Sequence, residues 1–396
     1  MKRKKILTVI FSAILCIGLF LAIQRLVEPK YAEEVLEGNF TAEYYDEDTK
    51  HDVIMVGDCE VYENFNPMYL WKNYGITSYI RGNAQQLPWQ SYYMLEDTLK
   101  YETPKVVIYN VQSLVHDAPQ REEYNRMALD GMKWSFTKWN AIQASMCEGE
   151  ETLDYIFPIL RYHDRISQLS QSDFKYYWKN RKITHNGYYM RIDVLPVSQA
   201  DVADPTWLLG DAYGNSKQSM EIDDPWAAID EDAKRDESDI VENTDLAKKS
   251  GSTGEFGAYP MKYLEKMRKL CEKNGIQFIL VKAPSLAPQW YDSDNEQVVE
   301  YATQHNIPYI NFYELLDEVG MDYETDTYDG GLHMNLNGAN KLSKYLGKVL
   351  IDEYGIKDHR EDEKISKVYK KKYQFYEDMI KQQQKELDQY GEVKSY

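Results

Sequence analysis

The chain has 396 residues, of which 43% are hydrophobic and 28% are charged, and its formal net charge is −19. This composition is that of a globular protein with a sizeable core rather than that of a disordered chain. Because contacts to phosphates require clustered Lys and Arg, the negative charge excludes nucleic acid as a partner.

The first 27 residues predict a membrane anchor. Lys2-Arg3-Lys4-Lys5 precedes a mostly apolar run from Ile6 to Ile23, which is near the lower length for spanning a bilayer. The basic cluster before the run and the acidic residues after it predict a cytoplasmic amino terminus and an extracytoplasmic remainder. A cleaved signal peptide is the alternative, but no Ala-x-Ala-like site follows the run. We therefore expect a single-pass protein of the cell membrane, with an acidic tether over residues 28–50.

Apolar segments that alternate with helical patterns predict one α/β domain over residues 51–357. The expected strands are Val53–Val56, Ile76–Ile80, Lys105–Asn110, Ile276–Val281 and Ile307–Phe312. The expected helices are Pro67–Gly75, Gln85–Lys100, Met261–Lys273, Ser293–Asn306 and Gly338–Ile351. This alternation favours parallel strands that are joined by right-handed crossovers.

The alternation is interrupted over residues 115–260, which we interpret as a long insertion after the third strand. Its first half contains aromatic-rich helical segments, and His185-Asn-Gly-Tyr-Tyr189 predicts a turn into a short strand. Its second half, 196–256, is rich in Asp, Glu, Ser and Gly, a composition typical of a mobile loop or surface excursion. Four aspartates there are a minor candidate for a calcium site, since they lack the spacing of a known calcium loop: Asp223, Asp224, Asp230 and Asp232.

Residues 358–396 predict a charged amphipathic helix. Its apolar residues recur at three- and four-residue steps, at Ile365, Tyr369, Tyr373, Tyr376 and Ile380. Packing against the domain is the favoured interpretation, and a coiled coil or a partner-binding helix is the alternative. The four cysteines are too few for a disulfide framework, although pairing of Cys147 with Cys271 stays open. No Cys/His spacing indicates a zinc site, and we expect no metal or cofactor.

The residues suited to chemistry follow predicted strands. The first strand ends at Gly57-Asp58-Cys59, where a tight turn into a helix would lift Cys59 towards solvent as a nucleophile. His333 follows a late strand and has acidic neighbours, with Asp329 as the nearest carboxylate and Asp326 as a substitute. The alternatives are a small half-buried cysteine and a loop histidine that only forms hydrogen bonds.

These residues resemble the sequence blocks of the SGNH/GDSL hydrolases. The blocks are Gly57-Asp58-Cys59, Gly82, Asn110, and Asp329 with His333; Met334-Asn-Leu-Asn-Gly-Ala339 is similar to a His-Leu-Asn-x-x-Gly-Ala run of that family. The resemblance covers residues 51–114 and 260–352. It implies a flavodoxin-like three-layer α/β/α sandwich with a five-stranded parallel sheet. It also implies that Cys59 is the nucleophile, His333 the base and Asp329 the acid, with Gly82 and Asn110 in the oxyanion hole.

Two positions depart from the family pattern. Residue 59 is Cys where the family usually has Ser, although a thiolate is a strong nucleophile and keeps ester chemistry open. The usual Asp-x-x-His spacing would place the acid at Gly330, whereas the nearest acid is Asp329. Both departures would also fit a member that has lost activity.

The resemblance implies a membrane-anchored hydrolase or acyltransferase that acts outside the cytoplasm on ester-linked acyl groups. A single anchor with an outward SGNH-like domain is similar to envelope proteins that work beside membrane-bound O-acyltransferases. The expected substrate class is therefore an acylated glycan or cell-envelope polymer. The alternative function is a catalytically inactive SGNH-like module that binds a glycan or a partner protein through its tyrosine-rich insertion.

Overall fold

The computed structural model describes residues 2–28, 37–119, 121–171, 173–174, 185–198, 255–288 and 290–395. Most of the acidic half of the predicted insertion, with its four aspartates, lies outside these residues, as do residues 29–36 of the predicted tether.

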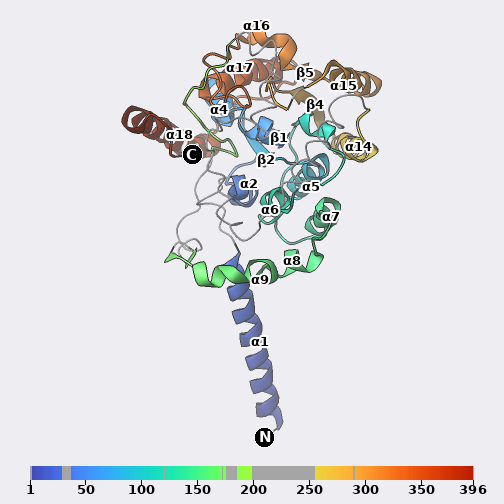
Figure 1. Ribbon diagram of the computed structural model, residues 1–396, viewed down its shortest axis with the longest axis vertical. Coiled ribbons are helices and arrows are strands. Elements are labelled where there is room, and N and C mark those ends of the chain that lie inside the picture. The colour runs from blue at the N-terminus through green and yellow to red at the C-terminus, as the bar shows by residue number, and fades with distance from the viewer. Residues whose placement is uncertain are drawn as a thin grey trace, which may run out of the picture.

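A sheet of five parallel strands forms the centre of the domain (Figure 1). The strands are β1 (Val53–Gly57), β2 (Ser78–Gly82), β3 (Val106–Asn110), β4 (Gln277–Lys282) and β5 (Tyr309–Asn311). Their order, β2-β1-β3-β4-β5, is that of flavodoxin-like folds, in which ligands bind near the switch point between β1 and β3. The predicted parallel α/β sheet is confirmed.

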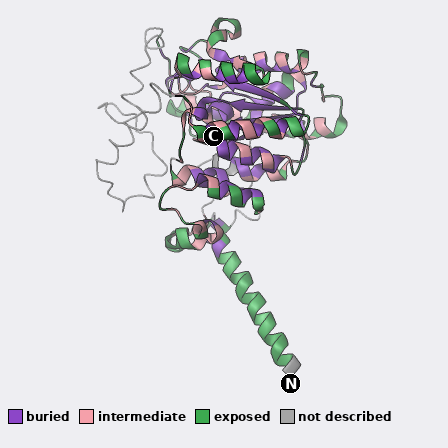
Figure 2. Cartoon of the chain, turned by 90° about the vertical axis from the view of Figure 1, so that its right-hand side faces the viewer, coloured by how far each residue is buried: buried purple, intermediate pink, exposed green. Residues whose placement is uncertain are grey.

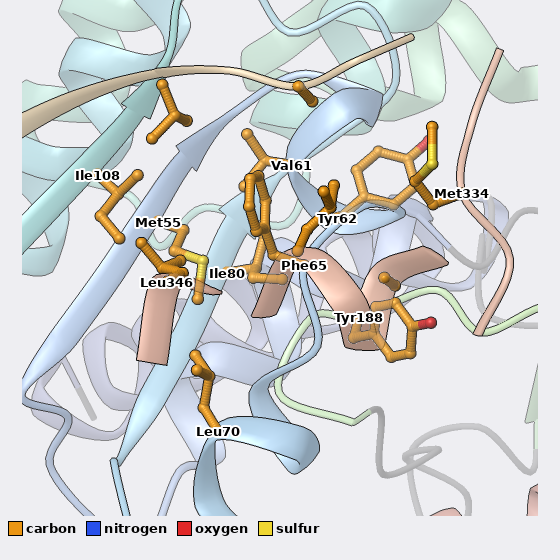
Figure 3. Packing of buried hydrophobic residues seen from close by; sticks show 14 of the residues in the cluster. Met55, Val61, Tyr62, Phe65, Leu70, Ile80, Ile108, Tyr188, Met334 and Leu346 are labelled. Carbon is orange, nitrogen blue, oxygen red and sulfur yellow. The ribbon is translucent and has the colours of Figure 1, made fainter. Parts of the chain in front are cut away.

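Helices cover both faces of the sheet, because successive side chains of each buried strand point to opposite faces. Val53 and Met55 of β1 belong to a core cluster on one face, and Ile54 and Val56 belong to a cluster on the other. Figure 3 shows part of the first cluster, in which Met55 and Ile108 of the sheet lie near Leu346. The covering helices are α4 (Pro67–Tyr74), α5 (Pro88–Thr98), α14 (Ala258–Lys273), α15 (Asp292–His305) and α17 (Leu336–Asp352).

Smaller elements complete the described fold. Between β3 and β4 the chain forms α6 (Glu122–Leu129), α7 (Phe136–Ser145), α8 (Thr152–Ile156), α9 (Pro158–Tyr162) and the 3₁₀ helix η3 (His163–Gln168). Other short elements are α2 (Glu37–Glu43), α3 (Cys59–Tyr62), α16 (Leu316–Val319), and the 3₁₀ helices η1 (Tyr44–Asp46), η2 (Gln112–Val115) and η5 (Phe312–Leu315).

The second strand and the segment after His185 differ from expectation. β2 begins two residues later than predicted and continues to Gly82, which pairs with Gly57. Residues 188–198 form no strand; their amides donate to the carbonyl of Tyr62 at the end of α3 and to those of Tyr323 and Thr327 on the loop before α17. The predicted short strand is therefore wrong, because a ladder needs successive partners on one neighbouring strand.

The amino-terminal helix α1 (Lys2–Val27) projects from the domain, and most of it is exposed (Figures 1 and 2). An 18-residue window within its stretch from Lys4 to Val27 has a mean hydropathy of 2.9, and the stretch is long and apolar enough to cross a membrane. Length and composition are compatible with a single-pass anchor or a signal sequence.

The carboxyl-terminal helix α18 (Glu363–Tyr390) packs on the domain. The Tyr369 ring stacks on Trp71, with 4.2 Å between ring centroids, and the Gln383 amide donates to the Met190 carbonyl over 2.8 Å. This is the packing favoured by the amphipathic pattern. All four cysteines are free, so Cys147 and Cys271 do not pair.

Candidate active site

Cys59 lies at the carboxyl edge of the sheet, on the turn between β1 and α3. Gly57 ends the strand with φ of +154°, and a Cβ there would come within 2.5 Å of Cγ2 of Val61, so a larger residue would not fit. Asp58 caps α3 by accepting from the Glu60 amide over 3.1 Å. Cys59 is the first residue of α3 and is half-buried. The strand, turn and helix follow one another as the sequence predicts.

His333 and Asp329 form a close pair on the loop before α17. Nδ1 of His333 lies 2.6 Å from Oδ2 of Asp329, and Oδ1 of the same carboxylate accepts from the His333 amide over 2.8 Å. Between them, Gly330 and Gly331 have φ of +74° and +91°, which folds the loop back on itself. These two left-handed glycines accommodate the extra residue relative to an Asp-x-x-His spacing.

Asp326, the substitute acid, has other partners. Its fully buried carboxylate accepts from Nζ of Lys341 over 2.6 Å and from the Asp322 amide over 2.7 Å. Asp329 is therefore the member of the two whose carboxylate contacts the His333 ring.

The His333 side chain acts on the Cys59 thiol and favours its thiolate, which brings three of the predicted site residues together. Burial raises the pKa of the Cys59 thiol to about 11, although His333 acts in the opposite direction. Burial alone would disfavour the His333 cation, but Glu63, Cys59 and Asp329 outweigh it and hold the pKa of His333 well above its ordinary range. Both shifts favour the protonated form of each group, which is a neutral thiol for Cys59 and an imidazolium for His333.

Glu63 is a second carboxylate beside His333 that the sequence reasoning missed. Its Oε2 lies 3.5 Å from Nδ1 of His333 and also accepts a hydrogen bond from the Tyr328 hydroxyl. The Tyr328 ring stacks against His333 with 6.3 Å between centroids. Glu63 lies four residues after Cys59, and residues at this helical spacing share one side of a helix. This spacing was the signal in the sequence that could have identified Glu63.

Asn64, also missed, joins three segments around the site. Its fully buried carboxamide donates to Oγ of Ser285 over 3.1 Å and accepts from the Met334 amide over 2.8 Å. The amide next to His333 is thus held to the end of α3 and to the loop after β4. A buried amide with both ends satisfied is a rigid connection, so Asn64 fixes the position of the His333 backbone relative to Cys59.

A buried charged cluster lies beneath the Cys59 turn. Nζ of Lys282, at the end of β4, contacts both carboxylate oxygens of Glu60 at 2.8 and 2.9 Å, and both side chains are almost completely buried. Asn110 donates to Oε2 of Glu60 over 2.9 Å. Burial, followed by the Glu60 charge, raises the pKa of Asp58 to about 7. The cluster ties the ends of β1, β3 and β4 together directly behind Cys59.

The predicted oxyanion-hole residues lie at the same edge. Gly82 pairs with Gly57, and a Cβ on Gly82 would approach the Gly57 carbonyl oxygen to 3.1 Å. Nδ2 of Asn110 donates to Glu60 and, over 3.3 Å, to Oδ1 of Asp58, and the residue is fully buried. Both Nδ2 hydrogens thus have partners within the cluster. Donation by Gly82 and Asn110 to an oxyanion stays a prediction.

One group of side chains in the described part of the chain has the composition of a metal site. Glu63, Asp329 and His333 each offer a ligand atom, and these atoms lie within 4.8 Å of one another. The 2.6 Å between Nδ1 and Oδ2 is a hydrogen-bond distance, so an ion bound there would have to displace the ring proton. As arranged, the group suits an imidazole that holds a proton on Nδ1, where both carboxylates face it.

Comparison of the chain with known protein families, with curated proteins and with solved structures finds no match.

Proposed function

We propose that the chain is a membrane-anchored SGNH/GDSL-type enzyme that hydrolyses or transfers ester-linked acyl groups. The observation that carries this proposal is the grouping of Cys59, His333 and Asp329 at the carboxyl edge of the sheet, where Asp329 contacts the His333 ring and His333 acts on the Cys59 thiol. A nucleophile that is hydrogen-bonded to a base, which is itself oriented by a carboxylate, is the arrangement used for acyl transfer on unrelated folds.

In the proposed reaction, the Cys59 sulfur attacks the carbonyl carbon of the ester and its proton passes to His333. Since Nδ1 of His333 faces Asp329, Nε2 is the nitrogen that receives the proton. The carbon–oxygen bond to the alcohol then breaks, and His333 returns the proton to the leaving oxygen. Water or an acceptor hydroxyl attacks the resulting thioester, gives its proton to His333, and releases Cys59 with the proton returned to sulfur.

The charges around the site set a condition for this reaction. Both the Cys59 thiol and His333 have raised pKa values, so both tend to be protonated before the reaction. His333 must lose one proton before it can accept the proton of Cys59. That proton is lost as the pH rises. The rate of acylation is therefore expected to rise with pH until the pair has lost this proton.

Glu63→Gln is expected to move this pH–rate profile towards lower pH. The Glu63 charge raises the pKa values of both Cys59 and His333, so its removal makes the His333 proton easier to lose. The measurement is the rate of p-nitrophenyl acetate turnover as a function of pH. Glu265→Gln on α14, whose carboxylate pairs with Arg268, is the matched control and should leave the profile unchanged. A profile that stays in place in Glu63→Gln would show that Glu63 does not act on the pair.

The substrate class follows from location and resemblance rather than from a bound ligand. The long apolar helix α1 supports a membrane location, and its basic start favours a domain outside the cytoplasm. An acylated glycan or cell-envelope polymer, together with a membrane-bound O-acyltransferase as partner, fits an enzyme held in that position.

The test of the proposal is hydrolysis of short p-nitrophenyl esters by the detergent-solubilised full chain. Wild type should release p-nitrophenol, Cys59→Ala should not, and Cys147→Ala, which removes another half-buried free thiol, should behave as wild type. Equal rates in wild type and Cys59→Ala would refute the nucleophile assignment. If wild type releases no product, hydrolysis is unsupported and transfer from an acyl donor becomes the reaction to assay.

A non-catalytic module that binds a glycan or a partner protein is the second candidate. It is favoured by the neutral state of the Cys59 thiol and by the engagement of the Asn110 amide within the buried cluster. It predicts that a thiol-reactive probe leaves Cys59 unlabelled at neutral pH while glycan binding survives His333→Ala. Labelling of Cys59 that disappears in His333→Ala would favour the enzyme.

A further inference from the structure

The carboxyl-terminal end of α1 is seated against α9 and η3, which lie across it (Figure 1). The Phe20 ring lies 6.0 Å from the Phe157 ring between centroids, and Nη1 of Arg165 donates to the Val27 carbonyl over 2.7 Å. Gln24 and Val27 are 6% and 0% exposed, whereas the apolar turns before them are bare. The last turns of α1 are thus part of the domain, and the rest of the helix extends away from it.

The position of Phe20 places this contact at membrane depth. Phe20 lies three residues before Ile23, where the apolar run ends, which corresponds to about 5 Å at 1.5 Å per residue. Interfacial segments bury their apolar face about 5–10 Å into the boundary between headgroups and acyl chains. If the apolar run of α1 spans a bilayer, Phe157 and its neighbours lie within that boundary.

The same segment exposes large apolar side chains. Leu153, Leu160 and Ile166 are 50%, 51% and 54% exposed, and all three lie within residues 152–168. Scattered exposed apolar residues are ordinary on soluble proteins, but these adjoin the helix that is apolar enough to span a membrane. Arg161 is also partly exposed within the segment, where its guanidinium pairs with Glu122 at 3.0 Å.

We propose that residues 152–168, which we call the collar, form a second membrane-contact surface that inserts into the interface of the bilayer beside α1. Its partner is the boundary between headgroups and acyl chains, and the collar holds the domain at a fixed angle to the membrane. The proposal rests on α1 lying in a bilayer and is independent of the acyl chemistry proposed for Cys59. It also requires α1 to be retained, because cleavage after the apolar run would remove the contacts of Phe20 with the collar.

The experiment is photolabelling of the full chain reconstituted in phosphatidylcholine vesicles that contain a lipid with a diazirine on its acyl chain. After illumination, peptide mapping by mass spectrometry locates the adducts. Adducts are expected in α1 and in the collar but not in α15, whose exposed Val299 provides an apolar reference far from α1. Adducts in α1 alone would overturn the proposal that the collar contacts the membrane. The absence of adducts from α1 would overturn the membrane anchor on which that proposal rests.

A charge introduced into the collar should remove its labelling. The double variant Leu153→Glu/Leu160→Glu is expected to reduce collar adducts about ten-fold while α1 adducts stay constant, because carboxylates are excluded from the acyl region. Val299→Glu is the matched control and should change neither. Leu153 and Leu160 are both half-exposed, so the double variant should still fold, and an unchanged circular dichroism spectrum checks this. Equal collar labelling in the double variant and the wild type would contradict the proposal.

Discussion

His333→Ala is expected to lower the rate of ester turnover by about 10³-fold or more, because the Cys59 thiol then lacks the group that takes and returns its proton. Asp329→Asn should cost less, about 10-fold, since Glu63 lies 3.5 Å from the same ring nitrogen and keeps a negative charge beside it. The double variant Glu63→Gln/Asp329→Asn should approach the loss seen in His333→Ala. The measurement is kcat/KM for p-nitrophenyl acetate.

His305→Ala is the matched control for these variants. His305 lies in the last turn of α15, near Glu265 and away from the Cys59 turn, so its replacement should leave the rate unchanged. If His333→Ala turns over substrate as fast as His305→Ala does, His333 is not the base. If Asp329→Asn alone equals His333→Ala, Glu63 does not support the imidazole.

Lys282→Met is expected to lower the free energy of unfolding by about 3–5 kcal/mol, because it leaves the Glu60 carboxylate buried without its cation. Both partners are almost completely buried, and the two contacts between them measure 2.8 and 2.9 Å. The double variant Glu60→Gln/Lys282→Met removes both charges and should be more stable than Lys282→Met. Denaturant unfolding of the detergent-solubilised chain, followed by circular dichroism, measures the three stabilities.

An exposed ion pair of the same domain supplies the comparison. Nζ of Lys105 contacts Asp52 at 2.8 Å, but the lysine side chain is 46% exposed. Lys105→Met should therefore cost only about 0–1 kcal/mol. A cost for Lys282→Met no larger than that for Lys105→Met would mean that the buried pair does not stabilise the sheet edge.

The strands and the Cys59 turn could be predicted from the sequence because their signals are local. Val53–Val56 is a continuous apolar segment of strand length that ends at a glycine, and the structure extends this strand by only that glycine. The pairing of His333 with Asp329 is also local, since they are four positions apart and two glycines allow the loop to close.

The groups that surround this pair were missed because they depend on contacts between distant parts of the chain. Glu60 and Lys282, which are in contact, are 222 positions apart in the sequence, and Asn64 and Met334 are 270 positions apart. Periodicity reports which face of an element is buried but not which distant polar group it meets there. A lysine at the end of an otherwise apolar strand was the available signal, because a buried cation requires a buried partner.

The predicted strand after His185 failed for a related reason. Tyr188 and Tyr189 have high strand propensity, but propensity reports a fit to a half-buried surface and not the presence of a neighbouring strand. The free edge of β2 is instead covered by Asn186, whose carbonyl accepts from the Ile80 amide over 2.9 Å and whose side chain donates to the Ser78 carbonyl over 2.8 Å. The edge is thus satisfied by a turn.

The most direct test of covalent catalysis by Cys59 is to trap the acyl-enzyme. The full chain is mixed with p-nitrophenyl acetate above pH 8, quenched in acid within the first turnover, digested and analysed by mass spectrometry. We predict an acetyl thioester on the peptide that contains Cys59, absent from Cys59→Ala and absent from the Cys147 peptide of the wild type. Release of p-nitrophenol without acetyl on Cys59, or equal acetylation of Cys59 and Cys147, would contradict the account.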